Sequence, residues 1–122
     1  MKNVASMTAL AALAALAALG AACGSSFRPP TDRLAASEAA IRSAKELGAQ
    51  NDPQAALHVK LADDQVATAR SLMRDGEHRR ADVVLQRAKS DAELAVVLTR
   101  EKSAKTDAQR AREILDAQKG GR

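Results

Sequence analysis

The sequence predicts an all-α fold: an antiparallel helical hairpin, a third and shorter N-terminal helix, and a long, overhanging, coiled-coil-like last helix. After the first 22 residues, the chain contains nine Leu, six Val, two Ile and one Phe. Eighteen large apolar residues in 100 are too few for the broad core of a sandwich, barrel or doubly wound sheet. The same 100 residues contain 19 Ala and many other strong helix formers. Their net charge of +3 is too small to be typical of a disordered chain.

Residues 1–22 have the pattern of a signal peptide. Lys2 is followed by an uncharged, mostly apolar run over 4–19 and then by the small residues 20–22. A run of about 16 residues is short for a transmembrane helix, which needs roughly 20. We therefore expect the chain to be exported, with a retained membrane helix as the less favoured alternative.

Cys23 is the only cysteine, so no intrachain disulfide can form. It follows Gly20-Ala21-Ala22, and this context resembles the lipobox of bacterial lipoproteins, although Leu19 lies one residue earlier than the lipobox leucine. The resemblance implies cleavage after Ala22, lipidation of the Cys23 sulfur and anchoring on the periplasmic side of a membrane. Gly24, in place of the Asp that signals inner-membrane retention, favours the outer membrane. The alternative is ordinary cleavage that releases a soluble periplasmic protein.

A flexible linker is expected over 23–30, because Gly24 and the serines are followed by Pro29-Pro30. A three-helix domain over 31–119 comes next. Its first helix is expected over 32–47, with Thr31 as N-cap and Gly48 just past the end. One face of this helix collects Leu34, Ser37, Ala40, Ile41, Ala44 and Leu47.

The second helix is expected over 53–74, since Asp52 can cap it and Pro53 suits the first helical position. Its apolar residues cover an arc of roughly 200° at 100° per residue. So wide an arc predicts that this helix is the middle member, packed between the other two. The arc contains Leu57, Val59, Leu61, Ala62, Val66, Ala69, Leu72 and Met73.

The third helix is expected over 77–119, after the turn signal Asp75-Gly76 and before a short tail over 120–122. It would be about 65 Å long, against about 33 Å for the second helix, so it can pair only as far as about Leu98. The remaining 20 or so residues must overhang. The stripe expected to form the hairpin core comprises Ala81, Val84, Leu85, Ala88, Ala92 and Ala95.

A second stripe on this helix, called the seam below, has the three-and-four spacing of a coiled coil and is interrupted only by Glu101. It predicts an interface with a second copy of the chain or with another helical envelope protein. The alternative is that alanine is common here and that such spacing arises without an interface. The seam comprises Leu94, Val97, Ala104, Ala108, Ala111 and Leu115.

A basic cluster is expected at the end of the bundle nearest Cys23. Up-down-up topology brings the start of the first helix beside the turn between the second and third. These residues could contact anionic lipid headgroups, although a solvated basic end is the favoured alternative. The candidate membrane-surface residues are Arg28, Arg33, Arg74, Arg79 and Arg80, with Arg70 and His78 nearby.

Motifs of catalysis are missing from the sequence, and we expect neither an enzyme nor catalytic residues. There is no paired-His motif, phosphate-binding glycine loop or nucleophile elbow. His58 has no metal-binding side chain three or four residues further on, so a half-buried structural histidine is favoured and no metal site is expected. The weak net charge and the lack of stacking aromatics argue against nucleic acid. No cofactor or small-molecule substrate is expected.

Between about Asp32 and Val97 the chain resembles the bacterial envelope family called domain of unknown function 4398. The resemblance is carried by the segment 34–41, by Pro53 opening a helix, by the turn 75–77 and by the segment 88–95. It implies a short, Ala-rich helical lipoprotein. Some members also contain an OmpA-like domain that binds peptidoglycan, a property not carried over to this chain.

The sequence therefore favours a membrane-anchored structural or adaptor element of the cell envelope, acting through its last helix. The alternative is a repeat-like helical module that binds peptides or unfolded clients. Against that alternative, only one helical hairpin is expected, whereas solenoids usually need three or more repeats.

Overall fold

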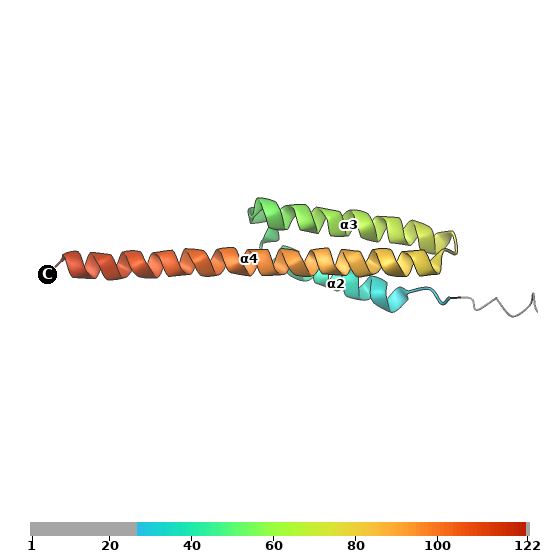
Figure 1. Ribbon diagram of the computed structural model, residues 1–122, viewed down its shortest axis with the longest axis horizontal. Coiled ribbons are helices and arrows are strands. Elements are labelled where there is room, and N and C mark those ends of the chain that lie inside the picture. Colours follow the sequence, from blue (N-terminus) through green and yellow to red (C-terminus); the bar gives the residue numbers. More distant parts are fainter. Residues whose placement is uncertain (1–26, 122) are drawn as a thin grey trace, which may run out of the picture.

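The computed structural model describes residues 27–121, which form three α-helices (Figure 1). These are α2 (Thr31–Glu46), α3 (Pro53–Arg74) and α4 (His78–Gly120), with a short 3-10 helix, η2 (Ala49–Asn51), between the first two. No strand occurs among the described residues. The prediction of an all-α fold with a long, overhanging last helix is confirmed. The expected signal peptide, Cys23 and the last tail residue, Arg122, lie outside the described residues.

The start of α2 differs from the expectation. Thr31 is the first helical residue rather than the N-cap, and no side chain caps this end. The carbonyl of buried Pro30 accepts a hydrogen bond from the Leu34 N–H at 3.0 Å, so Pro30 is the N-cap residue of α2. At the other end Gly48 has a φ of 84°. This left-handed conformation stops the helix, as expected of a residue that follows a C-cap.

Both ends of α3 are set by local chemistry. The Asp52 side chain accepts hydrogen bonds from the N–H groups of Gln54 and Ala55, at 3.0 and 2.9 Å. After α3, Gly76 has a φ of 77°. The Glu77 N–H reaches back to the Leu72 carbonyl at 2.8 Å, and the Gly76 N–H donates to Met73 at 3.3 Å. This pair of bonds is the Schellman arrangement, and it reverses the chain into α4.

The helix in the middle of the bundle is α4, not α3, so the prediction from the wide apolar arc is wrong. α4 packs along both α2 and α3, which touch each other much less (Figure 1). The outer part of the α3 arc faces solvent: Leu57 is 55% exposed and Leu61 is also exposed. Leu47, expected on the buried face of α2, is exposed as well, because the helix has already ended there.

The core is built from narrow stripes of small side chains. Residues buried on α3 and α4 recur at alternating steps of four and three, the spacing of packed helices that meet along a seam. Most are alanines, which let backbones approach closely. Ser37 of α2, fully buried, lies within hydrogen-bond distance of the Leu85 carbonyl of α4, at 2.9 Å. The buried stripes comprise Ser37, Ile41 and Ala44 on α2, Ala55, Val59, Ala62, Val66 and Ala69 on α3, and Ala81, Leu85, Ala88, Ala92 and Ala95 on α4.

Candidate functional site

The overhang, residues 99–120 of α4, contains no buried residue. Ala95 is the last buried residue of α4, and Leu98 is the last apolar side chain packed on the core. From that point α4 runs past the end of α3 as a single helix about 33 Å long (Figure 1). Its C-terminal end lies opposite the end at which α2 begins. Within residues 27–121 no helix is both long and apolar enough to span a membrane.

The root of the overhang is attached to the loop before α3. Lys102 Nζ donates a hydrogen bond to the Asn51 carbonyl at 2.9 Å and lies 3.4 Å from the Asp52 carboxylate. The Ala55 N–H, foremost, and the Lys102 ammonium lower the pKa of Asp52 below its usual 3.8. Asp52 therefore has two roles, capping α3 and holding the first turn of the overhang.

The lowered pKa predicts acid sensitivity at this junction. Because the carboxylate is favoured in the folded state, its stabilisation should be complete above about pH 4 and lost as pH falls through the folded-state pKa. Replacing Asp52→Asn, which retains a capping side chain, should reduce the fall in melting temperature between pH 5 and pH 2. The measurement is thermal unfolding followed by circular dichroism across this range. Asp116→Asn on the overhang is the control, and an equal effect of both variants would contradict the assignment.

The seam lies on the outside of α4. At 100° per residue it is centred about 170° around the helix from the buried stripe. Val97 is 57% exposed and Leu115 is 54% exposed. The structure thus leaves every seam position uncovered; the set comprises Leu94, Val97, Ala104, Ala108, Ala111 and Leu115.

Two further residues belong to this surface. Ile114, beside Leu115, is 60% exposed; it lies one position outside the strict three-and-four spacing of the seam, so that spacing did not predict it. Glu101, which interrupts the seam, pairs with Lys105 at 2.6 Å. This hydrogen bond raises the pKa of Lys105 above its usual 10.5. The charge that interrupts the seam is therefore neutralised within the same helix.

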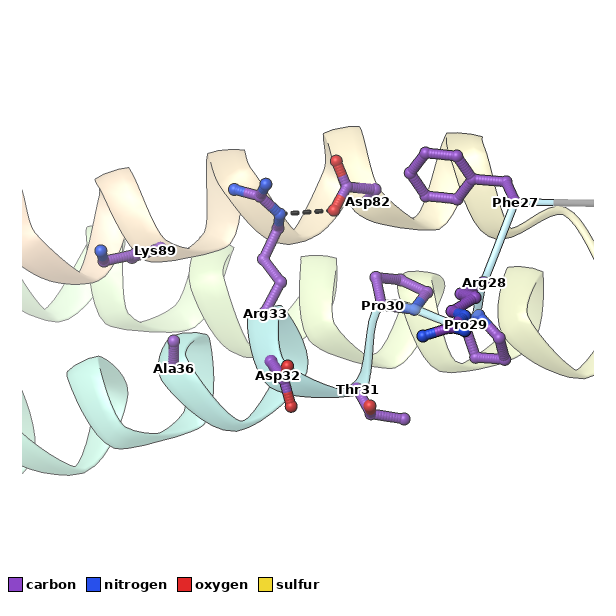
Figure 2. A pocket seen from close by; sticks show the side chains of 10 residues that line it. All are labelled: Phe27, Arg28, Pro29, Pro30, Thr31, Asp32, Arg33, Ala36, Asp82 and Lys89. Atoms are coloured by element: carbon purple, nitrogen blue, oxygen red, sulfur yellow. Dashed lines mark hydrogen bonds and ion pairs between the residues drawn. The ribbon is translucent and has the colours of Figure 1, made fainter. Parts of the chain in front are cut away.

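The end of the bundle where α2 begins brings the candidate membrane-surface residues near one another, but it also neutralises some of them. Figure 2 shows Arg33 reaching across to Asp82 of α4, at 2.5 Å. Arg80 pairs with Glu77. The Arg79 guanidinium lies 6.0 Å from the centre of the Phe27 ring.

Among the described residues, Arg28, Arg74 and Arg79 have no carboxylate partner. An open hollow at this end of the bundle is lined by Phe27, Arg28, Pro29, Pro30, Thr31, Asp32, Arg33, Ala36, Asp82 and Lys89 (Figure 2).

His58 has a structural environment. Its Nδ1 lies 2.9 Å from Oδ1 of Asp91 on α4, and Gln65 donates to Oδ2 of the same carboxylate at 2.8 Å. His58 and Gln65 are seven residues apart, so both face α4. No local motif predicts this cluster, because Asp91 is 33 residues from His58 along the chain. The three side chains hold α3 and α4 in register.

Comparisons with known proteins give one match. The family described as Domain of unknown function (DUF4398) matches residues 32–111. This range includes α2 from its second residue, the whole of α3, and α4 with its overhang as far as Ala111. No curated protein and no solved structure matches the chain.

Proposed function

The chain belongs to the family described as Domain of unknown function (DUF4398), and from this premise we propose that it is a lipid-anchored structural or adaptor protein of the cell envelope. Its lipid would be attached at Cys23, and its domain would face the periplasm from the outer membrane. The observation that carries the proposal is the overhang: a single helix of about 33 Å with an apolar stripe that nothing in the described chain covers. An isolated helix of this kind gains stability by docking.

The position of Cys23 in the sequence, as the proposed anchor, supports this function. α2 and α4 begin at the same end of the bundle, as the Arg33–Asp82 pair requires. Cys23 is only four residues before Phe27, which lies at this end beside Arg79. A lipid on Cys23 would therefore leave α4 directed away from the membrane, with the overhang as the most distant part.

Removing the overhang tests the proposal. A chain ending after Leu98 should keep its hairpin folded, because every buried residue of the described chain precedes that point. It should lose self-association or partner capture, measured by crosslinking and mass spectrometry in intact cells. A chain ending after Ala117 retains the whole seam and is the control. Equal crosslinking by both truncations would refute the adaptor role.

The same experiment separates this proposal from a client-binding module. One stoichiometric helical partner supports an adaptor, whereas many unrelated client proteins support the alternative. Contact of the basic end with anionic headgroups is a secondary part of the proposal. It depends on Arg28, Arg74 and Arg79, since Arg33 and Arg80 are already paired with carboxylates.

A further inference from the structure

We propose that the seam of α4 binds the seam of a second copy of this chain, with the two helices parallel and in register. The inference rests on the proposed function, because it names the partner of the overhang. It follows from the charges beside the seam and from the side of α4 on which α2 and α3 pack.

The shape of the bundle permits this dimer. On α4 the residues that contact α2 and α3 lie nearly opposite the seam, so both of those helices would point away from the partner. Two copies of α4 could then approach along the stripe from Leu94 to Leu115. Leu94, Glu101, Ala108 and Leu115 would occupy the a positions of a heptad repeat. Val97, Ala104 and Ala111 would occupy the d positions.

Charges beside the seam favour the parallel orientation. In a parallel pair, each g residue meets the e residue five positions further along the partner. Asp107 at g then meets the partner's Arg112 at e, and symmetry makes two such pairs. Arg112 forms no ion pair among the described residues, and Asp107 has only a long contact of 3.4 Å with Arg110. Both groups are therefore accessible for pairing between chains.

The one unfavourable g–e contact in this arrangement is offset. Arg100 at g meets the partner's Lys105, which has the same charge. Each Lys105 is already held by Glu101 of its own helix at 2.6 Å. Glu101, at an a position, also packs against Arg100 on the second copy, which occupies the g position just before the second copy's own Glu101. A single polar a position of this kind sets the register of a coiled coil at some cost in stability.

An antiparallel pair in the register that sets Ala104 opposite the partner's Ala108 lacks these pairings. In that arrangement e residues face e residues and g residues face g residues. Lys105 then meets the partner's Lys105, and Asp107 meets the partner's Asp107, so both contacts are repulsive. The parallel arrangement also places both copies of Phe27, and therefore both proposed anchors, at one end of the dimer. Two chains anchored in one membrane need this geometry.

Single cysteines in the overhang test the orientation. The chain is purified at full mature length with Cys23→Ala, and Ala111→Cys is introduced on the seam. Under mild oxidation we expect Ala111→Cys to form a disulfide-linked dimer. Ala117→Cys, on the other side of the same exposed helix, is the control and should stay monomeric. A mixture of Ala104→Cys and Ala108→Cys chains could instead crosslink more efficiently than Ala111→Cys chains crosslink with one another. That result would indicate the antiparallel arrangement and overturn the proposal.

A charge exchange tests the pairing itself. Asp107→Arg should weaken the dimer about tenfold in sedimentation equilibrium, because two attractive contacts become repulsive. Adding Arg112→Asp to the same chain should restore dimerisation. A wild-type chain that remains monomeric at about 100 μM overturns the dimer. If the chain is monomeric but the truncation after Leu98 abolishes capture of a different helical protein in cells, the dimer proposal fails and the adaptor function stands. If that truncation has no effect either, both proposals fail.

Discussion

Replacing Cys23→Ala should move the protein from the membrane fraction to the soluble fraction, with at least about a tenfold fall in the membrane-bound share. Two or more acyl chains hold a protein firmly, since each buried methylene contributes about 0.8 kcal/mol. The basic end alone, with three arginines lacking a carboxylate partner, would give only weak, salt-sensitive attachment.

The measurement is fractionation of cells followed by the intact mass of the protein recovered from membranes. Ser26→Ala is the matched control and should leave both the location and the acyl mass unchanged. A wild-type chain in the soluble fraction, with the mass of the polypeptide alone, would refute lipid anchoring. The proposed role of the overhang does not depend on the lipid, and the truncation after Leu98 would still test it.

Replacing Leu85→Ala should destabilise the bundle by about 2–5 kcal/mol. Leu85 is the large residue that is fully buried in α4, the helix that packs against both others. Its backbone carbonyl also lies at the contact with Ser37 of α2, at 2.9 Å. The neighbouring buried side chains are mostly alanines, which cannot rearrange to fill the cavity. Since small domains have only about 5–15 kcal/mol of stability, a loss of this size would remove a large fraction of the total.

Urea unfolding followed by circular dichroism at 222 nm measures this effect. The control is Leu115→Ala, the same substitution in the same helix at a position 54% exposed. It should cost less than about 0.5 kcal/mol at protein concentrations where the chain is monomeric. Similar losses for both variants would mean that the core is not centred on Leu85.

The helical fold could be predicted in some detail because its signals are local. Asp52 and Pro53 start α3 as expected, and Gly48 and Gly76 stop their helices in left-handed conformations. The stripe of small residues from Ala81 to Ala95 is buried as its spacing indicated. Capping, turn geometry and helical periodicity all depend on residues within a few positions of one another.

Contacts between helices could not be predicted in the same way. Asp91 joins His58 and Gln65, and Asp82 joins Arg33, across separations of 26 to 49 residues. Asp63 of α3 likewise pairs with Lys45 of α2 at 2.8 Å, across 18 residues. Each of these partners depends on which helix lies beside which, and that arrangement is not encoded in spacing along one helix.

By itself, the sequence determined the helical class, the approximate helix ends and the excess length of the last helix, because these follow from propensity, caps and rise per residue. Only the tertiary structure decided that α4 lies between α2 and α3. An apolar arc of a given width fits a helix with two neighbours, but it also fits one with a neighbour on one side and exposed leucines on the other. α4 approaches α2 closely at Ser37 and approaches α3 closely along the alanine stripes, and these contacts place α4 in the middle. This arrangement leaves Leu57 and Leu61 exposed on α3 and leaves the seam on the open side of α4.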